Sequence, residues 1–215
     1  MEVDFTMAER YIYSVGDDKS PVIRTKLEFD WVQGTSIQSR RKSALNLQAK
    51  FHANSREQLM EISTAAPERS LGFYLSAFNL KAKLKNIPDE LTVEQFYQGS
   101  KVVSINGTIT SLNDLYYSKD SVTAKKDSRL KYPIVHFQIM DKKYPIVPKT
   151  AFYNWIYINS MYYFNRGLYH ELTNSYCNHF CDTQAPITVD ACQAEACALL
   201  MYMHTNNINF KDLKQ

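Results

Sequence analysis

The sequence predicts a mainly α domain of the α+β class, with helices around a small number of strands. Three observations support this class. The chain of 215 residues has the length of one domain, and its composition, 45% hydrophobic and 22% charged, is that of an ordinary globular protein. Several segments combine helix-capping residues with helical spacing of apolar side chains. Strand alternation is confined to fewer segments, and no repeat or linker is present, so we expect one domain over residues 1–215.

The first segments mix strands with one long helix. Residues 1–30 read as short strands and turns, and the alternation in IRTKLEFDW, residues 23–31, predicts a half-buried strand. Residues 34–54 predict a loop followed by a helix whose first turn is basic. One side of that helix carries Ala44, Leu45, Gln48 and Phe51.

Two further segments precede the middle of the chain. SREQLMEIS, residues 55–63, starts with Ser55 and has Gln58 three residues later, the pattern of a capping box, so we expect a short helix. LGFYLSAFNLKAKL, residues 71–84, is expected to form strand and loop.

LTVEQFYQGSK, residues 91–101, carries the most chemical information. Thr92 with Gln95 three residues later forms another capping box, which predicts that a helix begins there. Its buried stripe is Val93, Phe96, Tyr97 and Ser100. A second stripe of Glu94, Gln98 and Lys101 is rotated by one residue and borders the core. This polar stripe is either the wet face of an ordinary amphipathic helix or the wall of a pocket.

The remaining elements are mostly helical. Residues 111–131 predict two short helices, and YPIVHFQIM, residues 132–140, is the clearest strand. Residues 148–164 predict an aromatic helix that is too apolar to be solvated on all sides. The last helices are expected in residues 165–174 and 191–205.

Composition and charge exclude some function classes. The chain has only 6 Gly and contains neither a dinucleotide-binding nor a P-loop glycine motif. Its net charge of +3 neither demands nor excludes nucleic acid. The acidic N-terminus lacks the apolar run of a signal peptide, and no stretch approaches the length of a membrane span. We therefore expect a cytoplasmic protein without a membrane partner.

Four cysteines near the C-terminus raise the question of zinc. They are Cys177, Cys181, Cys192 and Cys197, with His170 and His179 nearby. Their spacing is not that of a zinc knuckle, and two of them lie in an Ala-rich helical segment where Cys packs as a small hydrophobic residue. We expect buried reduced thiols and no metal.

Several motifs in order resemble the signature of the NADAR family. LSAFN, residues 75–79, is followed by a hydrophilic loop and then by TVEQFYQGSK, residues 92–101, with AKKDSRL further on. Ala77 stands where the family usually has Asn, with Asn79 two residues on. DACQAEACALLMYMH, residues 190–204, replaces the usual ending of the family.

With these departures, the sequence resembles one branch of the family more closely than the others. The members of that branch are antitoxins of DarT-type DNA ADP-ribosyltransferase toxins. The similar segments are FDWVQGTSIQSRRKS, EIST, LSAFNL, QGSKV and FYNWIYIN. The resemblance extends over about residues 26–203. It implies an NADAR-like domain with N-glycosidase activity.

The resemblance also implies a substrate. The toxin attaches ADP-ribose to guanine in DNA, and an NADAR antitoxin of this branch removes it as an ADP-ribosyl-DNA glycohydrolase. The expected partners are ADP-ribosylated DNA, with single strands favoured because the modified base must enter a pocket, free ADP-ribose, and functionally the cognate toxin. No cofactor and no metal are expected.

Glu94 and Lys101 are the predicted catalytic residues. Breaking a ribose C–N bond develops positive charge at the anomeric carbon, which a carboxylate stabilises, and the same carboxylate activates water. Lys101 either protonates the leaving base or traps the opened ribose, because an amine in a partly apolar site has a lowered pKa. Gln98 is expected to orient the ribose or the base edge.

Further residues are predicted to hold the substrate. The cations expected at the pyrophosphate are Arg40, Lys42, Lys125, Lys126 and Arg129. Trp31, close to a turn at Gly34, is expected either to stack on a ligand ring or to lie in the core. Ser76 and Asn79 are either ribose ligands or turn residues. Gln193 and Asp190 are the positions nearest to the family's C-terminal binding motif.

Two other functions remain open on the sequence. One is hydrolysis of a small N-glycoside, as in the riboflavin-pathway members of the family. The other is a non-catalytic module that binds ADP-ribose or sequesters the toxin. Activity on nucleotides without DNA favours the first, and protection of cells by a Glu94→Gln variant favours the second.

Overall fold

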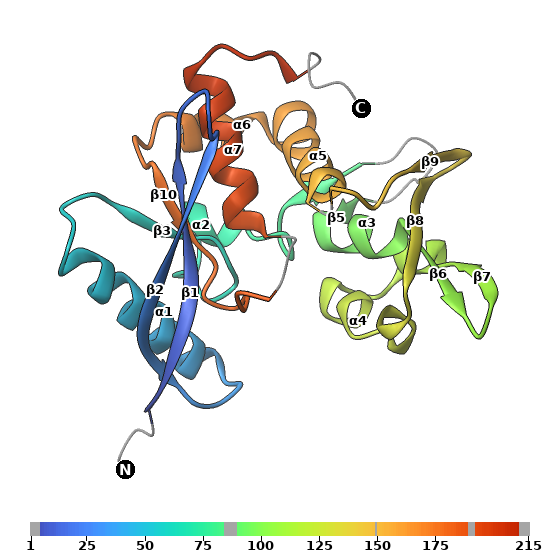
Figure 1. Cartoon of the computed structure of the whole chain (residues 1–215), viewed down its shortest axis with the longest axis horizontal. Helices are drawn as coiled ribbons and strands as arrows, with labels where there is room; N and C mark the ends of the chain where they lie inside the picture. Colours follow the sequence, from blue (N-terminus) through green and yellow to red (C-terminus); the bar gives the residue numbers. More distant parts are fainter. Residues whose placement is uncertain (1–4, 84–89, 149, 189–191, 211–215) are drawn as a thin grey trace. The chain divides into compact units, whose positions relative to one another are not determined.

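The chain forms two compact units, each with its own sheet and helices (Figure 1). The computed structural model describes residues 5–83, 90–148, 150–188 and 192–210. The first unit joins Met1–Ser76 to Arg166–Gln215, and the second is Ala77–Asn165. The α+β class is confirmed, but the expectation of a mainly helical fold with few strands is not, since the described residues contain ten strands.

A four-stranded sheet is the centre of the first unit. β1 (Phe5–Val15) and β2 (Val22–Val32) pair antiparallel along their whole length, as the long hairpin in Figure 1 shows. β10 (His179–Cys181) pairs with β1 antiparallel, and β3 (Leu59–Glu61) pairs with β10 in parallel. Strands far apart in the sequence therefore lie side by side.

Helices cover both faces of this sheet. Leu47 of α1 (Ile37–His52) packs against Ile12 of β1 in the core of the unit. Tyr13, the next residue, points to the opposite face, where α7 (Gln193–Thr205) packs against β1. The short helices of this unit are α2 (Leu71–Tyr74) and α6 (Arg166–Thr173). The helices predicted in residues 165–174 and 191–205 are confirmed.

Two of the secondary-structure predictions for the first unit are wrong. Residues 55–63 do not form a helix, because the Ser55 hydroxyl accepts a hydrogen bond from the Glu57 N–H in a turn, and the residues that follow become β3. Residues 71–74 form a helix instead of a strand, capped by the Ser70 hydroxyl. Leu45, grouped with Ala44 on one side of α1, is 61% exposed, whereas Ala44 is buried.

The second unit contains an antiparallel sheet and a short two-stranded ladder. The sheet has the order β7-β6-β8-β9, and the ladder joins β4 to β5. The strands are β4 (Lys81–Ala82), β5 (Leu91–Thr92), β6 (Lys101–Ile105), β7 (Thr108–Ser111), β8 (Ile134–Ile139) and β9 (Lys142–Tyr144). β8 confirms the strand predicted in residues 132–140.

Short helices surround these strands in the second unit. They are α3 (Val93–Gly99), the 3₁₀-helix η1 (Asn113–Tyr117), α4 (Ser121–Lys125), the 3₁₀-helix η2 (Ser128–Lys131) and α5 (Ala151–Asn159), which continues as the π-helix η3 (Ser160–Phe164). The start of α3 at Thr92 and the aromatic helix after Pro148 are confirmed, and residues 111–131 form three short helices where two were predicted.

Aromatic side chains fill much of the core of the second unit. The rings of Phe137 and Phe152 stack with centroids 4.2 Å apart, and Tyr97 of α3 lies 5.5 Å from Phe137. Tyr153 meets Tyr97 edge to face at 5.0 Å. Tyr97 of α3 is therefore packed between aromatic rings, which favours a fixed geometry for the other side chains of this helix.

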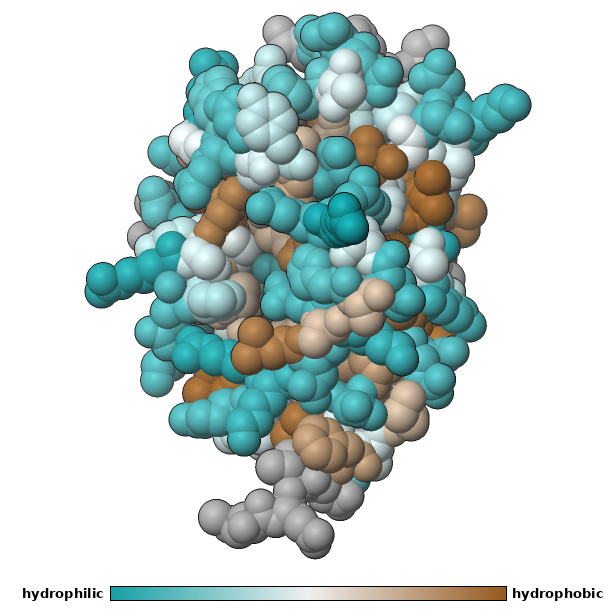
Figure 2. All heavy atoms as spheres, turned by 90° about the vertical axis from the view of Figure 1, so that its left-hand side faces the viewer, coloured by the Kyte–Doolittle hydropathy of each residue, from teal (hydrophilic) through white to brown (hydrophobic). Residues whose placement is uncertain are grey.

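The visible surface is predominantly hydrophilic. Figure 2 shows hydrophobic residues singly or in small groups among hydrophilic ones on the face that it presents. Scattered apolar residues of this kind are ordinary on a folded protein. Within the described segments, no helix has the length and apolar run needed to cross a bilayer.

Candidate active site

The beginning of α3 is fixed by a capping box and by the preceding loop. The Thr92 hydroxyl accepts from the Gln95 N–H, and the Gln95 side chain accepts from the Thr92 N–H. The Glu94 N–H donates to the Ala77 carbonyl at 2.9 Å. Ala77, at the position where the NADAR signature usually has Asn, therefore contributes its backbone to the placement of Glu94.

A continuous chain of hydrogen bonds links the predicted catalytic residues. Gln98 Nε2 donates to Glu94 Oε1 at 2.6 Å, and Lys101 Nζ donates to Gln98 Oε1 at 2.7 Å. The expectation that all three share one helix face is wrong, because α3 ends at Gly99 and Lys101 is the first residue of β6. The turn between them still brings the lysine back to the amide of Gln98.

Gly99 makes this turn possible. A Cβ atom at Gly99 would lie 2.3 Å from the ring of Tyr116, well inside van der Waals contact. The Tyr116 hydroxyl lies 3.0 Å from the Ser100 hydroxyl, so the ring is also tied to the residue that follows the helix. Only glycine lets α3 end this close to η1.

The site is buried, and burial changes the acidity of its lysine. Glu94 is 3% exposed and Gln98 is 1% exposed, so the polar stripe is not the wet face of an amphipathic helix. Burial, reinforced by the nearby positive charge of Lys125 and opposed by Glu94, lowers the pKa of Lys101 to about 8. The Lys101 ammonium also lies 4.5 Å from the centre of the Tyr97 ring, a cation–π contact that sequence analysis did not anticipate.

Lys125 belongs to the same cluster. Its Nζ lies 3.1 Å from Glu94 Oε1, so that oxygen contacts both the Lys125 ammonium and the Gln98 amide N–H. Within the residues that the structure describes, Glu94 Oε2 accepts no hydrogen bond. One oxygen of the carboxylate is therefore committed to the protein, and the other is left for a ligand or water.

The structure places the other predicted residues of the second unit in different surroundings. Asn79 lies half-buried in the loop before β4. Arg129 forms ion pairs with Asp114 and Asp127, and these bonds raise the pKa of its guanidinium. A phosphate at Arg129 would have to compete with two carboxylates that already neutralise it.

The remaining predicted substrate ligands lie in the first unit. Arg10 stacks over the Trp31 ring at 4.9 Å, and Trp31 packs beside the core of the sheet. Gly34 has a positive φ of 117° in the turn before α1. Arg40 Nη1 donates to the Thr64 hydroxyl at 3.2 Å. Lys42 is exposed on α1.

Two further predicted ligands in this unit are buried. Ser76 is completely inaccessible, at 0% exposure. Gln193 Nε2 donates to Asp182 Oδ2 at 2.9 Å at the start of α7. Asp190 lies outside the described residues.

A second buried carboxylate, Glu61 at the end of β3, was missed as a candidate. It accepts from Ser63 Oγ at 2.5 Å, from both the N–H and the hydroxyl of Thr183, and from the Cys181 thiol. Burial raises the pKa of this carboxyl. The EIST motif contains both Glu61 and its donor Ser63, but the donors Cys181 and Thr183 come 120 and 122 positions later, so no local spacing points to them.

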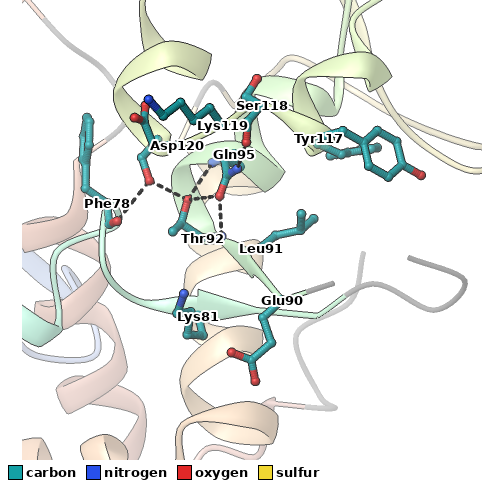
Figure 3. Close-up of a pocket in the computed structure, with 12 residues that line it drawn as sticks. Phe78, Lys81, Glu90, Leu91, Thr92, Gln95, Tyr117, Ser118, Lys119 and Asp120 are labelled. Carbon is teal, nitrogen blue, oxygen red and sulfur yellow. Dashed lines mark hydrogen bonds between the residues drawn. The ribbon is translucent and has the colours of Figure 1, made fainter. Parts of the chain in front are cut away.

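A hollow of about 370 Å³ borders the other side of α3 (Figure 3). Its polar floor is satisfied internally: Thr92 Oγ1 lies 2.8 Å from Ser121 Oγ, and Gln95 Nε2 donates to the Ser118 carbonyl. Figure 3 shows Glu90 pointing away from this floor. Neither Glu94 nor Lys101 lines this hollow. Its polar side chains connect the beginning of α3 to the beginning of α4.

The cysteines do not form a ligand cluster. Cys177, Cys181, Cys192 and Cys197 are buried and form no disulfide bond. Burial raises the pKa of the Cys192 thiol, as it does for Cys181 and Cys177. In the described part of the chain, no three His, Cys, Asp or Glu side chains are placed to hold a metal ion.

The fold and this cluster define an α+β protein with a buried carboxylate, amide and amine joined in series beside a second lysine. The family model described as DarT1-associated NADAR antitoxin matches residues 8–214. The chain therefore belongs to the DarT1-associated NADAR antitoxin family, and this membership supports a role as an antitoxin linked to a DarT toxin. A comparison with curated proteins gave no match.

Proposed function

We propose that this protein removes ADP-ribose from guanine bases of DNA by hydrolysing the N-glycosidic bond, and so acts as the antitoxin of a DNA ADP-ribosyltransferase. The observation that carries the proposal is the buried series Glu94–Gln98–Lys101. Membership of an antitoxin family associated with DarT1 supports the same conclusion. NADAR proteins in general are N-glycosidases, which fits a carboxylate and an amine in one site.

Glu94 has the properties required to stabilise the transition state. When the C–N bond lengthens, positive charge grows on the anomeric carbon, and a carboxylate in a site of low polarity stabilises that charge more strongly than water does. Its Oε1 is held by Gln98 and Lys125, which fixes the plane of the group. Its Oε2 then serves the ribose or orients the attacking water.

Lys101 has the properties required of the second group. The leaving guanine needs a proton, and an ammonium with a pKa of about 8 is mostly protonated at neutral pH while remaining a good acid. The same amine, once neutral, is a nucleophile for the opened ribose. Both roles place its Nζ beside the anomeric centre, at the end of the series that starts at Glu94.

The proposal is tested with purified protein and a short single-stranded oligonucleotide that carries ADP-ribose on one guanine. We expect wild type to release ADP-ribose and Glu94→Gln to be slower by at least about 100-fold, since the variant cannot carry the negative charge. Glu90→Gln, which alters an exposed carboxylate in the same unit, is the matched control and is expected to behave as wild type. Equal rates for wild type and Glu94→Gln would remove Glu94 from the reaction.

Two parallel assays distinguish the other candidate functions. Rapid cleavage of small N-glycosides, with no cleavage of the modified oligonucleotide, would assign the protein to small-molecule hydrolysis. Protection of toxin-expressing cells by Glu94→Gln, at an expression level equal to wild type, would assign it to sequestration. The proposed function requires that the variant fails to protect.

A further inference from the structure

The position of Lys125 gives it a different role from the other basic residues near the site. From its sequence position, Lys125 was expected to lie with other cations at a pyrophosphate. In the structure its Nζ is 3.1 Å from Glu94 Oε1, and its side chain is 51% exposed whereas that of Glu94 is 4% exposed. Lys125 therefore reaches from the surface to a buried carboxylate instead of pointing freely into solvent.

The short helix that carries Lys125 is fastened to the helix that carries Glu94. Asp120 caps α4 by accepting from the Thr123 N–H at 2.7 Å. Ser121 lies 2.8 Å from Thr92 and donates to the Phe78 carbonyl at 3.0 Å. Thr92 also caps α3, so the same residue contacts the beginning of both helices. This contact fixes α4 beside α3 and so places Lys125 next to Glu94.

Two positive charges thus compete for one carboxylate. Lys101 reaches Glu94 through the Gln98 amide, and Lys125 reaches it directly. The Lys125 ammonium makes protonation of Lys101 less favourable, while Glu94 favours it. A lysine beside another cation is a recognised way to keep an amine reactive near neutral pH.

We infer that Lys125 is a positioning residue of this site, which holds the Glu94 carboxylate in place and makes it easier for Lys101 to lose its proton. The inference rests on the proposed function, because it assigns a reactive role to Lys101. The electrostatics agree: burial is the largest cause of the lowered pKa of Lys101, the charge of Lys125 is the next, and Glu94 acts in the opposite sense. Loss of Lys125 would leave Glu94 free to hold the proton on Lys101.

The test measures the acidity of Lys101 directly and does not depend on activity. Protein labelled with ¹³C at lysine Cε is titrated by NMR, and the Lys101 resonance is assigned by its absence in Lys101→Arg. We expect Lys125→Met to raise the pKa of Lys101 by about one unit. Lys125→Arg is expected to preserve it. Lys119→Met removes an exposed lysine before the start of α4 and is the matched control.

The same variants are then compared in the hydrolysis assay. With the neutral amine of Lys101 as the nucleophile, a pKa that is one unit higher leaves about tenfold less of the reactive form at pH 7, so kcat/KM of Lys125→Met is expected to fall about tenfold there and to recover near pH 9. Circular dichroism and thermal unfolding confirm that the variants are folded. Lys125→Gln, which also removes the positive charge and is likewise expected to raise the pKa of Lys101, replaces the methionine variant where that variant unfolds.

The outcomes separate this inference from its competitor and from the proposed function. An unchanged pKa of Lys101 in folded Lys125→Met overturns the inference. An unchanged pKa with a raised KM for the oligonucleotide also overturns it and returns Lys125 to phosphate binding. If no protein hydrolyses the oligonucleotide, the proposed function fails, while the NMR titration still decides whether Lys125 controls Lys101.

Discussion

At the scale of single residues, Lys101 connects the stability of the fold with the reactivity of the site. Its ordinary pKa of 10.5 applies in the unfolded chain, whereas in the folded protein the pKa is about 8. Between these values the unfolded chain binds more protons, so the contribution of Lys101 to the free energy of unfolding rises with pH. Below pH 8, where Lys101 is charged in both states, its burial lowers the free energy of unfolding by up to about 3 kcal/mol. A site selected for reactivity carries such costs.

We therefore predict that Lys101→Met is more stable than wild type at pH 7 although it is inactive. Its advantage in free energy of unfolding is expected to be largest below pH 8 and to disappear as the pH approaches 10.5, because wild-type Lys101 loses its charge over that range. Urea unfolding of both proteins at a series of pH values measures the difference. A difference that stays constant from pH 7 to pH 10 would show that the Lys101 charge is not destabilised in the folded state.

At the scale of secondary-structure elements, the junction of α3 with β6 decides whether Lys101 returns to Gln98. We predict that Gly99→Ala destabilises the protein by about 2 kcal/mol, because its Cβ overlaps the Tyr116 ring. Activity is expected to fall as well, since a shift of the junction moves Lys101 at the start of β6. Chemical unfolding and the hydrolysis assay measure the two effects.

Gly167→Ala is the matched control for this prediction. A Cβ atom at Gly167 meets nothing within 4 Å, and the residue lies in the first turn of α6 with no positive φ. We expect this variant to be as stable as wild type or up to about 1 kcal/mol more stable, with unchanged activity. Equal behaviour of the two alanine variants would mean that the contact with Tyr116 relaxes without cost.

Local signals predicted some elements and not others, for identifiable reasons. The capping box at Thr92 and Gln95 is complete within four residues, so the start of α3 was predictable. The same pattern at Ser55 failed, because the residues after it pair with β10 more than a hundred residues later, and strand formation depends on such partners. Strands of two or three residues, such as β4, are too short for periodicity to reveal.

In the candidate site too, contacts between residues close in sequence were predictable and contacts between distant residues were not. Spacing placed Glu94 and Gln98 one turn apart, and the structure joins them. The pairing of Lys125 with Glu94 could not be predicted, because it depends on how α4 docks against α3. Glu61 escaped notice for the same reason, since its partners at Cys181 and Thr183 come from the other end of the chain.

At the scale of the whole molecule, charge limits how the protein recognises DNA. The 25 basic residues are nearly balanced by 22 acidic ones, and several of the basic side chains are engaged in ion pairs. Unspecific affinity for a phosphate backbone grows with the number of cations that contact it. With so small an excess, the ADP-ribose group and the modified base must provide most of the binding free energy.

We predict that Glu94→Gln binds an ADP-ribosylated single strand at least about 100-fold more tightly than the same strand without the modification, since a net charge of only +3 gives the phosphate backbone little attraction. A plot of log affinity against log salt concentration is expected to have a slope no steeper than about −2, as three phosphate contacts on a single strand would give. Fluorescence anisotropy at several salt concentrations measures both quantities. Equal affinities for the two strands together with a slope near −6 would mean that the backbone is the main ligand, and that selection of the modified base occurs after binding and not during it.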